Sequence, residues 1–266
     1  MENQEAIQAR EEKPKEKWIE RLQGPSDLLT AAVNIYRQKF LKIMALYGIT
    51  ILSFLPLAAV FGLYWFINKG VGMDITVKAI LQVILGLAGL AAIIWAIFCS
   101  LAAQVGIYLA PESPESEKIM ELFKRGRNLA GKYLVVSFVV GIFTFLWMLL
   151  LIVPGIIMSV YYSFAVLCLI YEGYRAGKAL KRSKELVKGY WWSVAGRTIF
   201  IGLVMWLVII ILSIPLWVVD ENSLLAEIWG MIVNVASYLI APVGTIYSYL
   251  IFKNLQKIKG VKTANN

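Results

Sequence analysis

The sequence predicts an all-α polytopic membrane protein, with six transmembrane helices in three hairpins and a cytosolic interfacial amphipathic helix before each hairpin. Hydrophobic residues make up 59% of the chain and charged residues 16%, against about 25% charged residues in soluble globular domains. Residues 43–68, 79–111, 133–171, 198–219 and 228–252 contain no Asp, Glu, Lys or Arg. A helix crosses a bilayer with about 20 apolar residues. These blocks argue against a soluble protein, because they would leave it almost no polar surface.

The predicted boundaries follow the charges and the turn residues. Residues 1–24 are predicted to be a mobile cytosolic tail, 25–255 the six-span membrane domain, and 256–266 a basic cytosolic tail. Apolar residues recur at helical spacing in three amphipathic segments, 25–40, 115–130 and 174–189. The charge-free block 133–171 is too long for one crossing, and Pro154-Gly155 divides it. The predicted spans are about 43–67, 79–109, 133–153, 156–172, 195–219 and 224–252.

The basic residues predict the orientation. In chain order, the seven loops and tails contain 8, 2, 5, 0, 7, 0 and 4 Lys or Arg residues, where Arg197 at the start of the fifth span is counted with the loop before it. Lys and Arg accumulate in cytosolic loops. We therefore expect both termini and both long loops in the cytosol, in a multi-pass protein of the plasma (inner) membrane of a prokaryote. Tyr108, Tyr171 and Tyr247 recur at the same place in the returning spans, which is consistent with three related hairpins.

One stretch of about 45 residues carries a resemblance to a known family. It contains a Pro154-Gly155-Ile156 turn, a hydrophobic helix that ends at Glu172, an Ala-Leu-Lys-Arg-Ser element at 179–183, and a Gly-Tyr-Trp-Trp element at 189–192. This pattern resembles a superfamily of uncharacterised six-span prokaryotic membrane proteins, which includes the membrane domain fused to some glycerophosphoryl diester phosphodiesterases. The resemblance implies a six-span architecture. It implies no activity, and no segment is long enough to hold the phosphodiesterase domain itself.

The composition limits the chemistry. The chain contains no histidine, which removes His-based acid–base catalysis and His metal sites. Cys99 and Cys168 lie inside hydrophobic blocks, without metal-ligand spacing. No nucleophile stands beside a base in the sequence pattern. We therefore expect no enzyme activity, no metal, no cofactor and no nucleic-acid partner.

The third amphipathic segment is the first candidate site. Its basic residues are predicted to contact lipid headgroups, and the aromatic residues that follow are predicted to anchor the chain at the membrane interface. The headgroup contacts are Arg175, Lys178, Lys181, Arg182 and Lys188, and the anchors are Tyr190, Trp191 and Trp192. The segment is expected to lie in the interface plane with its apolar stripe in the lipid. The alternative is that these basic residues only set the topology.

Polar residues within the spans form a second candidate set, which either lines a pathway or makes interhelical contacts. They are Gln82, Gln104, Glu172, Glu227 and Asn234. Glu172 is also placed to pair with Arg175 at i, i+3 or to accept a hydrogen bond from the next helix. The favoured function is a membrane accessory or scaffold protein that contacts lipids, including anionic ones, or a membrane protein partner. The alternatives are a transporter or channel for a small or lipid-like solute, and a lipid-modifying enzyme.

Overall fold

The computed structural model describes residues 22–70, 72, 74–220 and 223–260, and the described residues form helices and turns without strands. Six helices are long and apolar enough to cross a membrane. The predicted fold class, an all-α polytopic membrane protein, is therefore confirmed. The helices are α2 (Pro25–Leu52), α3 (Leu55–Gly70), α4 (Ile75–Leu109), η1 (Ala110–Glu112), α5 (Ile119–Leu150), α6 (Ile152–Tyr162), α7 (Ala165–Glu172), α8 (Ala176–Val187), α9 (Trp191–Ser213), η2 (Ile214–Trp217) and α10 (Leu224–Ile258).

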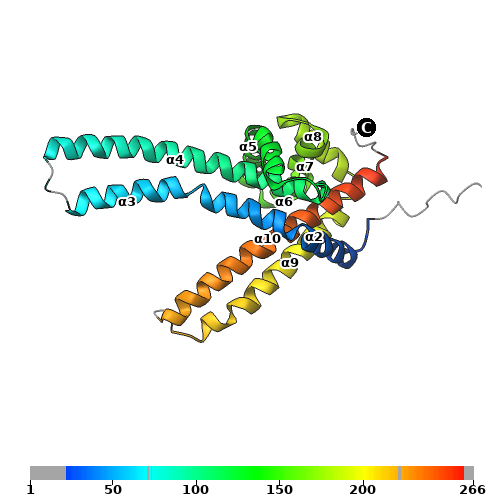
Figure 1. Ribbon diagram of the computed structural model, residues 1–266. Helices are drawn as coiled ribbons and strands as arrows, with labels where there is room; N and C mark the ends of the chain where they lie inside the picture. Colours follow the sequence, from blue (N-terminus) through cyan, green and yellow to red (C-terminus); the bar gives the residue numbers. More distant parts are fainter. Residues whose placement is uncertain (1–21, 71, 73, 221–222, 261–266) are drawn as a thin grey trace, which may run out of the picture.

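Two helical hairpins project from a shared core as separate arms (Figure 1), and α5 pairs with α6 in a third hairpin. One arm is α3 with the first half of α4, and the other is α9 with the first half of α10. The buried residues of α4, α5 and α10 lie only in the halves nearest the core, within 92–109, 122–136 and 242–256. We call the core end of the molecule, which also carries α8, the basic end. The arms expose apolar side chains over most of their length, as expected where lipid is the solvent.

The first amphipathic segment is not a separate helix. It continues without a break into the first span as α2, and the chain bends instead at Ser53 and Phe54. Pro56 explains this position, because its ring would clash with the carbonyl of Leu52 and it has no N–H to donate. The bend therefore lies within the predicted first span of 43–67.

The second amphipathic segment is likewise continuous with its span, as α5. Its apolar face packs on α4 through small residues. A Cβ atom on Gly126 would lie 2.1 Å from the carbonyl oxygen of Ala102 and 3.0 Å from the backbone nitrogen of Gly106. Small residues four apart on one helix allow close backbone approach in membranes. The face predicted to lie at the interface is therefore part of the protein core.

The turn of the second hairpin lies slightly before the predicted one. Leu151 has an extended backbone between α5 and α6, so Pro154 falls in the first turn of α6, where proline is tolerated. Gly155 then packs against α5, and a Cβ atom there would lie 2.8 Å from the Cα atom of Met148. The Pro-Gly pair starts the returning helix and allows it to pack closely.

Part of each predicted tail packs with the helices. Leu22 and Gln23 accept hydrogen bonds from the Arg197 guanidinium at 2.7–2.9 Å, so residues 22–24 are held against α9. At the other end, α10 continues to Ile258, and Gln256 is buried. Residues 1–21 and 261–266, which make up the rest of the predicted tails, lie outside the described residues.

Candidate functional site

The helix α8 is the predicted third amphipathic segment, but its apolar face contacts protein. Gly173 ends α7 with a positive φ of 74°, which glycine adopts without strain. The chain then turns back, and α8 packs against α5, α6, α7 and α10. Ala179, Leu180 and Leu186 are buried there. The apolar stripe predicted to lie shallowly in lipid is therefore covered by the protein itself.

Ser183 on the buried face of α8 connects it to the break between α6 and α7. Its hydroxyl donates to the carbonyl of Tyr161 at 2.7 Å and accepts the N–H of Phe164 at 3.1 Å. These two backbone groups face the interruption of the helix. A buried backbone group without a partner costs about 1–3 kcal/mol. Ser183 therefore stabilises the interruption of the fourth span.

The carboxylate of Glu172 binds Arg182. Two guanidinium nitrogens of Arg182 donate to it at 2.7 and 3.2 Å, and the amide of Gln256 donates at 2.7 Å. This hydrogen bonding to Glu172 raises the pKa of Arg182. Of the two predicted arrangements, the structure shows acceptance from the next helix, α8, and Arg175 is exposed. Glu172 therefore joins α7, α8 and α10, and Arg182 is committed to the protein rather than to a headgroup.

Other basic residues at this end are also committed to internal contacts. Lys39 is buried and donates to the carbonyl of Ser113 at 2.7 Å. Lys253 pairs with Glu112 at 2.5 Å. Lys259 donates to the carbonyl of Lys188 at 2.8 Å, and burial lowers its pKa. These lysines hold α2, η1, α8 and α10 together.

The remaining basic side chains of α8 and its flanks point outward, and we call them the basic row. They are Arg175, Lys178, Lys181, Lys184 and Lys188, all exposed. Within the part of the chain that the structure describes, none of them makes an ion pair. The row differs from the predicted headgroup contacts at two positions. Lys184 is exposed and belongs to it, whereas Arg182 turns inward and does not. Four of the five predicted headgroup residues are thus exposed together.

An apolar groove borders the basic row, with a volume of about 470 Å³. We call it the tryptophan groove, lined by Val153, Ile156, Ile157, Tyr161, Trp191 and Trp192. The ammonium of Lys184 lies 5.8 Å from the Tyr161 ring centroid, at the edge of the groove. The indole N–H of Trp191 donates to the carbonyl of Ile157 at 3.1 Å. Of the three predicted anchors, Trp191 is thus bound to α6, Tyr190 is half-buried and Trp192 is 83% exposed.

The polar residues predicted within the spans do not come together. Gln82 donates to Asn68 at 3.0 Å on the first arm, and Asn234 donates to the carbonyl of Gly230 in its own helix. Glu227 is exposed near the start of α10. Glu172 lies in the ion pair described above. Of the five, Gln104 lines the crevice described next.

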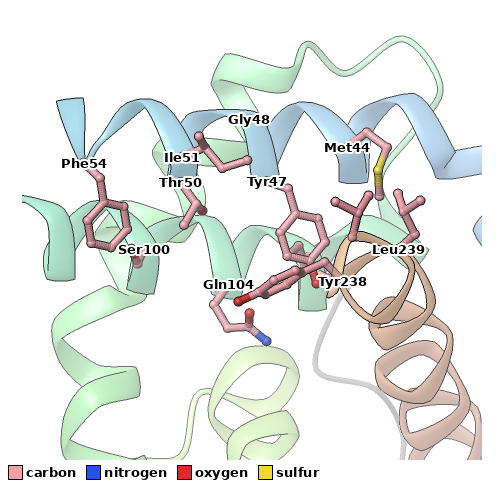
Figure 2. A pocket seen from close by; sticks show the side chains of 12 residues that line it. Met44, Tyr47, Gly48, Thr50, Ile51, Phe54, Ser100, Gln104, Tyr238 and Leu239 are labelled. Carbon is pink, nitrogen blue, oxygen red and sulfur yellow. The ribbon is translucent and has the colours of Figure 1, made fainter. Parts of the chain in front are cut away.

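A second cavity, which the sequence pattern did not reveal, lies between α2, α4 and α10. It has a volume of about 610 Å³. Figure 2 shows its lining residues, which are Met44, Tyr47, Gly48, Thr50, Ile51, Phe54, Ser100, Gln104, Ile107, Val235, Tyr238 and Leu239. We call it the α2–α10 crevice. Its residues come from three distant segments, so only the tertiary structure brings them together.

Comparison with known proteins gives no further guide to the site. No protein-family model, curated protein sequence or solved structure matches this chain. Among the described residues, no three His, Cys, Asp or Glu side chains lie close enough together to hold a metal ion.

Proposed function

We propose that this chain is a membrane accessory or scaffold protein that binds anionic phospholipid at its basic end. In this proposal the basic end and both termini lie in the cytosol of a prokaryotic cell, and the spans lie in its plasma membrane. The observation that carries the proposal is the basic row, exposed and without ion pairs, directly beside the tryptophan groove. Such a surface offers charge to a phosphate and an apolar wall to the chain attached to it.

The expected strength follows from the charges. Each Lys or Arg near an anionic membrane surface contributes about 1 kcal/mol of attraction, which is screened within a Debye length. Four of the five residues in the row are lysines, which act as compact point charges rather than bidentate partners. The row should therefore prefer anionic over zwitterionic lipid without selecting one headgroup, and the preference should weaken as salt rises.

The alternative is that the basic residues only set the topology. It explains why these residues are positively charged, but it does not explain the groups packed around them. The positive-inside rule requires basic loops, yet it does not require the ion pairing of Arg182 or an apolar groove beside Lys184. The transport alternative has less support, because the candidate pathway residues Gln82, Asn234 and Glu227 lie apart and make only local contacts or none within the described residues.

The test removes the charge of the row and leaves its packing intact. Lys178, Lys181, Lys184 and Lys188 are replaced with Gln in the full-length protein, which is placed in bilayer discs of phosphatidylglycerol and phosphatidylcholine. Native mass spectrometry then counts each retained lipid. We expect the phosphatidylglycerol occupancy of the row to fall at least about tenfold, since about four favourable contacts are lost. Arg182 is left unchanged because it holds α8 in place.

The control removes the same charge elsewhere on the basic end. Lys118, Lys124, Arg127 and Lys257 are exposed, and their replacement with Gln should reduce the retained phosphatidylglycerol much less. Equal losses of retained phosphatidylglycerol in the two variants would mean that any surface charge attracts the lipid, and would refute a specific binding site at the row. Unchanged retention in the α8 variant would leave only a topological role.

A further inference from the structure

The α2–α10 crevice holds hydroxyl groups that have no hydrogen-bond partner among the described residues. The rings of Tyr47 and Tyr238 meet edge to face, with centroids 6.5 Å apart, and Tyr238 extends toward Gln104 (Figure 2). Neither tyrosine hydroxyl has a hydrogen-bond partner within the described residues. A hydroxyl left unbonded in an apolar medium costs about 1–3 kcal/mol. The crevice is therefore suited to a ligand with acceptor oxygens.

The other hydroxyls of the crevice differ from these two. Thr50 and Ser100 each donate to a carbonyl one turn earlier in their own helix, at 3.2 and 2.7 Å. Gln104 also lines the crevice, and its amide makes no hydrogen bond to another described residue. The remaining lining is apolar apart from these groups. Among the described residues, Tyr47, Tyr238 and Gln104 are thus the lining groups that present unused donors.

An unpaired cation lies on the same side of α2 as the crevice. Arg37 precedes Met44 by two helical turns, so both occupy one face of the helix. Arg37 is exposed and makes no ion pair within the described residues. It lies about 15 Å before Tyr47 along the axis, toward the basic end. A guanidinium at this position can bind a phosphate with two parallel hydrogen bonds.

One hydrogen bond joins α2 to α10 at the level of Arg37, and the crevice is otherwise open along its length. The hydroxyl of Tyr36 donates to the carbonyl of Leu239 at 2.6 Å, which joins α2 to α10 there. Beyond this contact the two helices diverge into separate arms (Figure 1). A ligand would therefore enter sideways from the bilayer rather than from water.

We propose that the α2–α10 crevice binds one glycerophospholipid from the leaflet at the basic end. The phosphate binds Arg37, ester carbonyl oxygens accept hydrogen bonds from Tyr47 and Tyr238, and one acyl chain lies against Gly48 and Ile51. The volume of about 610 Å³ falls in the usual range of ligand pockets, about 300–1,000 Å³. This site involves other helices than the basic row, so each can exist without the other.

Gly48 provides the decisive variant. A Cβ atom on Gly48 would meet nothing within 4 Å, so Gly48→Leu fills the crevice without displacing the backbone. Gly62 on α3 also has open space around a Cβ position and does not line the crevice, so Gly62→Leu is the matched control. Native mass spectrometry of each protein from discs of equal phosphatidylglycerol and phosphatidylcholine counts lipid that survives detergent washing. Beyond any lipid held at the basic row, we expect one retained phospholipid in the wild type and in Gly62→Leu, and at least about tenfold lower occupancy of this site in Gly48→Leu.

Two further variants test the polar contacts separately. Arg37→Gln should keep the bound lipid but lose the preference for phosphatidylglycerol over phosphatidylcholine. The double variant Tyr47→Phe with Tyr238→Phe keeps both rings and removes both hydroxyls, so its occupancy should fall even if Gly48→Leu does not fold. The four-lysine variant of α8 should keep this lipid, which separates the present site from the basic row.

Three results would overturn the proposal. The first is equal lipid retention in Gly48→Leu and Gly62→Leu, both folded. The second is a wild-type protein that retains no phospholipid from the discs. The third is retention of a neutral apolar compound of another mass in place of phospholipid, which would assign the crevice to a different occupant.

Discussion

Arg182 donates two hydrogen bonds to the carboxylate of Glu172, at 2.7 and 3.2 Å. Only 17% of the arginine side chain and 8% of the glutamate side chain are exposed. The pair joins the last residue of α7 to the middle of α8, and so determines which face of α8 points inward. Because Arg182 turns inward, the basic row is presented on the outside.

Removing one member of this pair should be costly. Arg182→Gln leaves the Glu172 carboxylate partly buried with only Gln256 as a donor, and we expect a loss of about 2–4 kcal/mol in the free energy of unfolding. Arg125→Gln is the matched control, since Arg125 pairs with Glu117 but its side chain is 52% exposed, and it should cost under about 1 kcal/mol. Thermal unfolding of both proteins in detergent gives the comparison. Equal stability losses would contradict a structural role for the pair.

Gly126 should tolerate no side chain. Gly126→Ala places a methyl group 2.1 Å from the carbonyl oxygen of Ala102, so α5 must move away from α4, at a cost of about 1–3 kcal/mol or more. Gly131 lies on the same helix with open space around a Cβ position. Gly131→Ala should be neutral or stabilising, because alanine favours the helix by about 1 kcal/mol. Midpoints of thermal unfolding that shift alike for the two variants would refute the close crossing.

Ser183 should matter more than other serines in the bundle. Ser183→Ala removes both contacts at the α6–α7 break and leaves the Tyr161 carbonyl and Phe164 N–H unpaired, which we expect to cost about 1–3 kcal/mol. Ser213 serves as the comparison, because its hydroxyl only donates to the Ile209 carbonyl one turn earlier. Ser213→Ala should change little. Hydrogen exchange at the α6–α7 break should rise in Ser183→Ala alone, and protection that stays unchanged would count against the role assigned to the hydroxyl.

The topology is directly testable. Reporter tags at both termini and at positions 125 and 185 should be accessible from the cytosol. Tags near 72, 155 and 221 should be accessible from outside. The expectation rests on the alternation of basic residues between successive loops. The tag near 155 is the most informative, because a cytosolic signal there would mean that α6 and α7 do not cross the membrane as predicted.

Purified protein is expected to show no hydrolysis of glycerophosphodiesters or phospholipids. The chain lacks histidine, and among the described residues Glu172 is bound in an ion pair while Glu227 is exposed with no partner nearby. Neither arrangement places a base beside a nucleophile. Turnover that persists through purification and is abolished by Glu172→Gln or Glu227→Gln would contradict this expectation.

The class of fold could be predicted from the sequence because a bilayer imposes one-dimensional rules. Span length, the absence of charge and the Pro154-Gly155 break all lie along the chain, and they predicted six helices that the structure confirms. The amphipathic period of 174–189 also predicted α8 as a separate helix. Each of these properties is determined within a single segment.

The tertiary structure decided which faces meet. Periodicity shows that 119–130 and 176–187 each have an apolar face, but lipid and protein are equally apolar partners for it. The close crossing at Gly126 and the hydrogen bonds of the Ser183 hydroxyl show that both apolar faces pack against protein. The α2–α10 crevice is beyond sequence reasoning for the same physical reason. Tyr47 and Tyr238 are separated by most of the chain, and they face one another only because the Tyr36–Leu239 contact joins α2 to α10 before the arms diverge.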